Sequence, residues 1–130
     1  MTNQELIAKA KEAMTKAYAP YSHFQVGAAL LAKDGRVFTG CNVENATYGA
    51  TICAERTAVT KAVSEGVREF EKIAIVASSG DYAAPCGICR QVLFEFMPEG
   101  KVVLWSELEG EKELALTELL PFGFRGEDIK

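Results

Sequence analysis

Three cysteines and one glutamate are the residues of this chain whose types and spacing could do chemistry. Cys53 is followed two places on by Glu55, and a Pro-Cys-x-x-Cys run further along contains Cys86 and Cys89. A Cys-x-x-Cys pair holds soft metals, and Cys53 would bring the number of sulfur ligands to three. Structural zinc sites close with four protein ligands, whereas catalytic ones leave the fourth position to water. The pattern therefore predicts a catalytic zinc site in which Glu55 stays free to move protons.

Two further residues could change this ligand count. Cys41 lies among strand-like residues, where a cysteine behaves as a small buried hydrophobe. His23, the only histidine, follows Pro20 and Tyr21 in an expected loop, so we place it at the surface or at the rim of the site. Taken alone, the Cys-x-x-Cys pair also fits a redox dithiol or a structural zinc knuckle, and neither alternative explains the glutamate after Cys53.

Two expected helices must position the cysteines. Residues 54–65 are rich in helix formers and are followed by a glycine, and residues 87–97 form the second helix. Cys53 then lies at the N-terminus of the first helix, and Cys86 and Cys89 lie in the first turn of the second. Because unpaired N–H groups at a helix N-terminus lower the pKa of a thiol, each cysteine is favoured as a thiolate.

Two charged residues follow Cys53 and would act beside the metal. Residues two apart on a helix do not share a face, so we do not expect Glu55 to bind the same ion as Cys53. In a partly desolvated pocket the pKa of Glu55 would rise toward the operating pH, which suits a group that accepts and returns a proton. Arg56 is placed to donate a hydrogen bond to a thiolate, with an ordinary surface arginine as the alternative.

The remaining elements predict an α/β fold. A capping box at Thr2 and Glu5 starts a helix that we end near Tyr18, and an Asp-Gly turn joins two antiparallel strands. Because strand–helix–strand crossovers favour parallel neighbours, we predict a single domain with a mixed sheet of about five strands and helices on both faces. The domain covers residues 1–130; the expected strands are 24–32, 36–43, 73–77, 102–105 and 112–116, and 117–120 forms at most one helical turn.

Composition and charge exclude several classes of protein. The chain has 130 residues, and its net charge of −4 without a basic stripe argues against a nucleic-acid partner. No apolar run approaches the roughly twenty residues of a membrane span, and the N-terminus lacks the pattern of a secretory signal. We therefore expect a cytoplasmic protein with no membrane partner, in which the cysteines stay reduced.

One polar pair outside the metal motif suggests a binding role. Asn42 and Glu44 leave the second expected strand, and in an extended segment both side chains point the same way. An amide and a carboxylate side by side suit a vicinal diol, although the spacing alone favours an ordinary exposed polar face.

The motifs together give a family resemblance. A Cys-x-Glu run followed by Pro-Cys-x-x-Cys is the signature of zinc deaminases that act on nucleobases. Over almost its whole length the chain resembles the small, homotetrameric cytidine deaminases. The matching stretches are Tyr18-Ala19-Pro20-Tyr21-Ser22, Phe24-Gln25-Val26-Gly27-Ala28-Ala29, Asn42-Val43-Glu44-Asn45-Ala46, Cys53-Ala54-Glu55-Arg56-Thr57-Ala58 and Pro85-Cys86-Gly87-Ile88-Cys89-Arg90-Gln91.

The resemblance implies an activity and its catalytic residues. The reaction is the hydrolytic deamination of cytidine and 2′-deoxycytidine to uridine and 2′-deoxyuridine, with release of ammonia, in pyrimidine salvage. Glu55 is the proton shuttle for a zinc-activated water that attacks C4 of the cytosine ring, and Arg56 supports the ligands. One zinc ion per subunit is bound by Cys53, Cys86 and Cys89.

The resemblance also implies contacts to the nucleoside. Asn42 and Glu44 resemble the pair that binds the ribose hydroxyls, which replaces the ordinary polar face as our expectation. Phe24 resembles the aromatic residue that packs on the pyrimidine, and Ala54 is a further substrate contact. The residues that resemble those supplied by neighbouring subunits of a homotetramer are Ala46, Tyr48 and Phe124.

The chain also departs from the family and resembles a second one. Where this chain has Ala84, the family often has serine, but the contact there runs through the backbone, so function should survive. The tail after Phe124 suggests no mechanism. Aminonucleoside deaminases of the blasticidin type resemble the chain around the zinc motifs, but the stretch with Asn42 and Glu44 favours a nucleoside enzyme. A nucleotide or nucleic-acid deaminase is disfavoured because nothing obvious supplies phosphate contacts.

Overall fold

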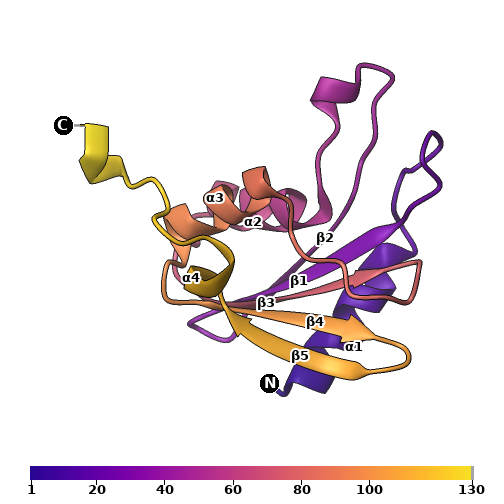
Figure 1. The fold of residues 1–130 in the computed structure, drawn as a ribbon, viewed down its shortest axis with the longest axis horizontal. Helices are drawn as coiled ribbons and strands as arrows, with labels where there is room; N and C mark the ends of the chain where they lie inside the picture. Colours follow the sequence, from indigo (N-terminus) through magenta and orange to yellow (C-terminus); the bar gives the residue numbers. More distant parts are fainter. Residues whose placement is uncertain (130) are drawn as a thin grey trace.

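The computed structural model describes residues 1–129 and forms one five-stranded sheet between helices (Figure 1). The fold is therefore the predicted mixed α/β architecture. The elements are α1 (Asn3–Met14), β1 (Val26–Ala32), β2 (Val37–Cys41), the 3₁₀ turn η1 (Tyr48–Ala50), α2 (Ala54–Ser64), β3 (Phe70–Ala77), α3 (Gly87–Phe96), β4 (Lys101–Ser106), β5 (Gly110–Ala115), α4 (Leu116–Leu119) and the 3₁₀ turn η2 (Gly126–Ile129).

The sheet has the strand order β2-β1-β3-β4-β5. The predicted hairpin joins β1 to β2, with Leu31 opposite Val37, and Gly35 supplies its turn with a φ of 94°. Of the two crossovers, the one through α3 joins parallel neighbours, β3 and β4, as expected. For the crossover through α2 the expectation of neighbours was wrong. β2 and β3 point the same way, but β1 pairs antiparallel with both and separates them.

Helices cover both faces of the sheet, as predicted. Successive side chains of a strand point to opposite faces of the sheet, so alternate residues of β1 pack into the hydrophobic cores on its two sides. On one face Ala29 and Leu31 pack with Leu6 and Ala10 of α1. The core on the other face joins the sheet to α2 and α3 and includes Ala28, Leu30, Ala58, Val59, Ile73, Ile75, Leu93 and Phe94.

α1 ends at Met14, earlier than the predicted end near Tyr18. The capping box at its start is present, with Thr2 and Glu5 exchanging hydrogen bonds of 3.1 Å. The early end has a tertiary cause. The backbone of Tyr18 pairs with the segment after β2, donating its N–H to the Asn42 carbonyl at 3.0 Å and accepting from the Glu44 N–H at 2.8 Å. These bonds require an extended Tyr18, and the helix stops before it.

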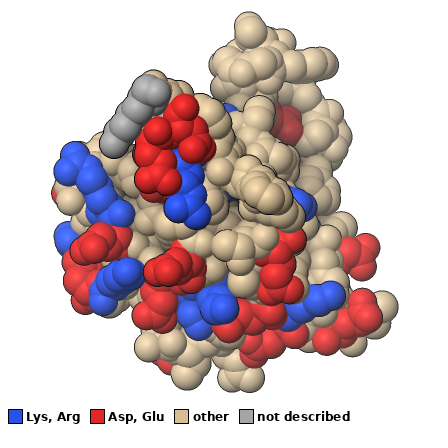
Figure 2. Space-filling view, turned by 60° about the vertical axis from the view of Figure 1, so that its left-hand side comes forward, with Lys and Arg blue, Asp and Glu red and all other residues tan. Residues whose placement is uncertain are grey.

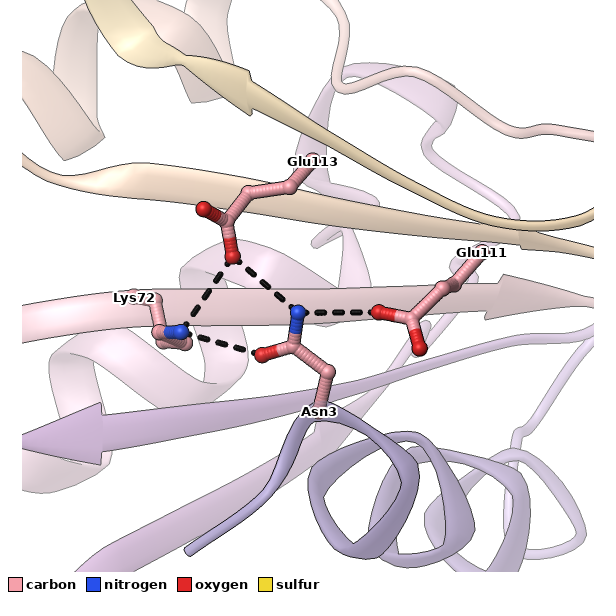
Figure 3. Close-up of polar contacts among 4 residues, drawn as sticks. All are labelled: Asn3, Lys72, Glu111 and Glu113. Atoms are coloured by element: carbon pink, nitrogen blue, oxygen red, sulfur yellow. Dashed lines mark hydrogen bonds and ion pairs between the residues drawn. The ribbon is translucent and has the colours of Figure 1, made fainter.

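A polar network ties the N-terminus of α1 to the sheet (Figure 3). The Asn3 amide donates to Glu111 at 2.9 Å and to Glu113 at 3.0 Å, both on β5. Lys72 of β3 donates to the Asn3 carbonyl oxygen at 3.0 Å and pairs with Glu113 at 3.2 Å. The network therefore joins α1, β3 and β5 across the buried strand β4.

Charged side chains of both signs are interspersed on the face shown in Figure 2, consistent with the absence of a basic stripe from the sequence. Within residues 1–129, none of the helices is both long and apolar enough to cross a membrane. Two loops, 18–25 and 42–52, project beyond one edge of the sheet (Figure 1).

Candidate active site

The three predicted cysteine ligands meet where two helices begin. Because β2 and β3 run in the same direction, their carboxyl ends lie at the same edge of the sheet, and α2 and α3 both start there (Figure 1). Cys53 is the N-cap residue of α2, Cys86 is the N-cap residue of α3, and Cys89 lies in the first turn of α3. The Sγ atoms of Cys53 and Cys86 are 4.0 Å apart.

The sulfur cluster has the size and chemistry that zinc requires. All three Sγ atoms lie within 4.8 Å of one another. Tetrahedral Zn–S bonds of about 2.3 Å place two sulfurs roughly 3.8 Å apart, so the cluster needs only a small contraction to hold the ion. Among the described residues, the His, Cys, Asp and Glu side chains close enough to share a metal are these three cysteines. Neither Glu55 nor His23 joins them, as predicted.

The pKa values of Cys53 and Cys89 are shifted in opposite directions. A hydrogen bond from the Cys89 thiol, together with Arg56, lowers the pKa of Cys53 to about 5. The same interaction and burial raise the pKa of Cys89. A metal requires thiolates and releases the remaining thiol protons when it binds. One thiolate is thus already formed before the ion arrives.

Arg56 lies against the cluster rather than at the open surface. Its Nη2 donates to the Cys53 sulfur at 3.4 Å and to the Thr51 carbonyl at 3.5 Å. Its Nε is buried and has no hydrogen-bond partner among residues 1–129. A buried donor without a partner costs free energy, and here the nearby acceptors are sulfurs that become more negative when they bind a metal. The alternative of an ordinary surface arginine does not describe this geometry.

Glu55 is a buried carboxylic acid beside the cluster. Only 5% of its surface is exposed, and burial raises its pKa to about 7, with the charge on Cys53 as a further cause. The group therefore sits near its own midpoint at neutral pH. A group at its midpoint can accept and return a proton with little cost in either direction, which is the property required of a general acid–base catalyst.

The predicted sugar-binding pair does not form a uniform polar surface. Asn42 is 8% exposed, and its amide is used inside the protein: Nδ2 donates to the Phe24 carbonyl at 2.8 Å, and Oδ1 accepts from the Val26 N–H at 2.9 Å. Glu44 is half-buried and bonds to the backbone of Tyr21 at 3.0 Å. Asn42 thus fixes the start of β1 and the position of Phe24, whose side chain is exposed.

Glu44 and Tyr48 line one cavity of about 350 Å³ between the two projecting loops. Its other lining residues are Tyr21, Ser22, Asn45 and Thr51.

The three residues expected to act in a neighbouring subunit's site are exposed on this chain. Tyr48 is 76% exposed and packs edge-on against Tyr21, and Ala46 lies in the same loop. Phe124 is 55% exposed and lies beside α3, where the Gln91 amide bonds to its backbone N–H and carbonyl at 3.0 and 2.7 Å. Ala54, by contrast, is fully buried at the start of α2.

Sequence reasoning missed a residue that holds the cysteine loop. Arg90 of α3 donates from Nε to the Pro85 carbonyl at 2.7 Å and from Nη1 to the Leu119 carbonyl at 2.8 Å. It thereby connects the residue before Cys86 to the end of α4. Its place in the Pro-Cys-x-x-Cys-Arg run was the available signal, but the partners are distant in sequence.

Comparisons with known proteins agree with this geometry. Residues 1–105 match the family model of the cytidine and deoxycytidylate deaminase zinc-binding region. A cytidine deaminase of Halalkalibacterium halodurans is 52% identical over 130 residues, covering 99% of this chain and 98% of that protein. One of Sporosarcina psychrophila is 49% identical over 130 residues, covering 99% and 96%. A crystal structure of cytidine deaminase from Burkholderia pseudomallei matches with a TM-score of 0.90 at 50% identity, covering 95% of this chain and all of that one (100%).

The fold, the sulfur cluster and these matches place the chain in the cytidine and deoxycytidylate deaminase zinc-binding family. The chain covers 96% and 98% of the two bacterial cytidine deaminases to which it is similar. Zinc is the metal that its three cysteines fit.

Proposed function

We propose that this chain hydrolyses the exocyclic amine of cytidine and 2′-deoxycytidine, giving uridine or 2′-deoxyuridine and ammonia. The observation that carries the proposal is the cluster of Cys53, Cys86 and Cys89 with a buried Glu55 beside it. This cluster occurs in a chain about half identical, over its full length, to proteins named cytidine deaminase. We place the reaction in pyrimidine salvage and assign residues 1–130 to a single domain. Because the site requires reduced thiols, we expect a cytoplasmic location.

The proposed chemistry assigns the proton transfers to Glu55. When bound by the three cysteines, zinc supplies a Lewis acid that lowers the pKa of water. Glu55 accepts a proton from the attacking water as the new C4–O bond forms. Glu55 delivers that proton to N3 of the ring. Glu55 then takes the remaining proton from the new C4–OH group and passes it to the amine as the C4–N bond breaks and the C4 carbonyl forms. Its pKa of about 7 allows both directions at neutral pH.

The proposed nucleoside contacts use the cavity between the loops. Glu44 lines that cavity and, with Asn42, binds the sugar hydroxyls. Asn42 also orients Phe24 by donating to the Phe24 carbonyl. Phe24 packs on the pyrimidine, and Ala54 follows Cys53 closely enough to contact the ring through its backbone. Arg56 keeps the Cys53 sulfur in position.

We also propose that the protein is a homotetramer whose sites are completed by neighbouring subunits. The support is the exposure of apolar side chains that a single chain leaves uncovered, with Tyr48 at 76%, Phe122 at 106% and Phe124 at 55%. Ala46, Tyr48 and Phe124 are the residues assigned to a neighbour's site.

The direct test mixes zinc-loaded protein with cytidine and follows both the ultraviolet change at the ring and the release of ammonia. We expect turnover in the wild type. Glu55→Gln should keep its zinc and its fold while turnover falls by about a hundredfold or more, because a general acid–base group is lost. If a folded, zinc-loaded wild type releases no ammonia from cytidine, the proposal fails, and aminated nucleoside antibiotics of the blasticidin type are the next substrates to examine. Near-normal activity of the Glu55→Gln variant would remove Glu55 from its role.

A further inference from the structure

The carboxylate of Glu44 is held by three donors from two adjacent residues of the 18–25 loop. Glu44 Oε1 accepts the backbone N–H of Tyr21 at 3.0 Å and that of Ser22 at 3.1 Å. Glu44 Oε2 accepts the Ser22 hydroxyl. The partners are more than twenty positions apart in the sequence, so this contact joins the two loops that form the cavity.

The Ser22 hydroxyl has a defined direction. It accepts the backbone N–H of Phe24 at 3.0 Å. A hydroxyl has one proton to donate, and an ionised carboxylate can only accept, so the proton of Ser22 points at Glu44. His23, between the two residues, has a φ of 59°, and this left-handed conformation turns Phe24 back toward Ser22. Ser22 therefore links Glu44 to Phe24.

Counting acceptor positions shows what remains for a ligand. Each carboxylate oxygen offers about two lone-pair positions. The two backbone N–H groups fill both positions on Glu44 Oε1, and Ser22 fills one of the two on Oε2. One position is left, and Glu44 is among the residues that line the cavity.

We propose that Ser22 is a positioning residue that fixes the Glu44 carboxylate so that one acceptor position faces a single sugar hydroxyl. The inference rests on the proposed function, because it takes a nucleoside as the occupant of the cavity. Ser22 acts through Glu44 and does not itself touch the ring. It follows that Glu44 discriminates the presence of one hydroxyl and not of a vicinal pair, which is consistent with a substrate range that includes 2′-deoxycytidine.

The charge of Glu44 supports the same geometry. The Ser22 hydroxyl and the two backbone N–H groups hold the pKa of Glu44 below its ordinary value. The titratable groups that face Glu44 are Tyr21 and His23 of the 18–25 loop, which holds the carboxylate, and Tyr48 across the cavity. None of them donates a hydrogen bond to the carboxylate from its side chain in the described part of the chain.

The kinetic test compares two substrates that differ in one hydroxyl, 2′-deoxycytidine and 2′,3′-dideoxycytidine. Ser22→Ala should raise KM for 2′-deoxycytidine about tenfold, because a bond to a charged group is lost, while kcat changes little. The KM, or the inhibition constant, of 2′,3′-dideoxycytidine should stay within about twofold, since that ligand lacks the hydroxyl concerned. Ser22→Thr keeps the hydroxyl and should restore most of the KM. Ser64→Ala, which removes a hydroxyl bonded to a helix carbonyl at 2.8 Å, is the matched control.

A general structural role for Ser22 would weaken both ligands equally, and that result would overturn the proposal. A second measurement separates it from the proposed function. In zinc-loaded protein without nucleoside, ¹³C-labelled glutamate carboxylates are titrated by NMR, with Glu44→Gln used for assignment. Ser22→Ala should raise the pKa of Glu44 toward its ordinary value, and Ser64→Ala should not. Unchanged titration of Glu44 in Ser22→Ala would overturn the positioning role, even if the wild type proved inactive on cytidine.

Discussion

Cys53 and Glu55 are two positions apart on one helix, and their surroundings shift them in opposite directions. A hydrogen bond from Cys89, with Arg56, lowers the pKa of Cys53 to about 5, whereas burial raises that of Glu55 to about 7. Cys53 begins α2 as its N-cap, while Glu55 turns into the covered side of the helix. The spacing of two residues therefore separates a metal ligand with a lowered pKa from a carboxylic acid with a raised one.

Each of the three cysteines should be needed to hold the metal. Cys86→Ala should lose zinc together with activity, because two remaining sulfurs no longer form the set of three. Cys41→Ala is the matched control: Cys41 is half-buried on β2 and lies outside the cluster, so this variant should keep one zinc per chain. Metal analysis by atomic absorption of the two purified variants decides the matter. Full zinc occupancy in Cys86→Ala would exclude Cys86 as a ligand.

The position of the cluster depends on how closely α2 approaches β2. A Cβ atom added to Gly40 of β2 would lie 2.5 Å from the Ala54 carbonyl oxygen and 2.6 Å from the Ala58 nitrogen. Both of these atoms belong to the backbone of α2, and Ala54 directly follows Cys53. The absence of a side chain at Gly40 thus sets the distance between the sheet and the helix that carries Glu55 and Arg56.

Gly40→Ala should therefore destabilise the protein and disturb the site. Because a helix backbone must shift, we expect the free energy of unfolding to fall by about 1–3 kcal/mol, with weaker zinc binding. Gly126→Ala is the control, since no described residue lies within 4 Å of a Cβ there, and it should change stability by less than about 0.5 kcal/mol. Urea unfolding of the wild type, Gly40→Ala and Gly126→Ala measures the differences in the free energy of unfolding. Equal stability of all three would mean that α2 can move without cost.

The network in Figure 3 gives a pH-dependent prediction for α1. The Asn3 hydrogen bond, and then Lys72, hold the pKa of Glu113 below its ordinary value. A lowered folded-state pKa stabilises the protein above the unfolded pKa, and this contribution is lost as the pH falls through the folded pKa. Glu113→Gln should therefore be less stable than the wild type at pH 7, and the difference should shrink near pH 3.

Urea unfolding at both pH values tests this. Glu127→Gln, which removes a 3.7 Å ion pair to the exposed Arg125 within the same turn, is the control and should have little effect at either pH. A stability difference between Glu113→Gln and the wild type that persists unchanged into acid would show that the charge of Glu113 is not its cause.

Local sequence signals predicted the helices, the strands and the sulfur ligands. They did not predict the contacts between segments that are distant in the sequence. Helix caps and the Cys-x-x-Cys spacing are short-range patterns, so the starts of α2 and α3 and the three ligands could be read directly. The insertion of β1 between β2 and β3 depends on which strands pair, which no local pattern encodes. The same holds for the early end of α1 and for the bond between Ser22 and Glu44.

The proposed sharing of sites between subunits predicts that two defective variants restore each other. Glu55→Gln removes the proton shuttle but leaves Phe124, and Phe124→Ala does the reverse. If Phe124 acts in a neighbour's site, a mixed assembly contains sites with an intact Glu55 from one chain and an intact Phe124 from the other.

Unfolding the two variants together and refolding them with zinc should therefore give more activity than the sum of the two refolded alone. The control mixture pairs Glu55→Gln with Cys86→Ala. The cysteine cluster and the Glu55 beside it come from the same chain, so this mixture should show no gain. Sedimentation of each refolded sample reports the assembly state. Mixed assemblies of Glu55→Gln and Phe124→Ala with no gain in activity, or full activity of a Phe124→Ala variant alone, would show that Phe124 does not complete the site of another subunit.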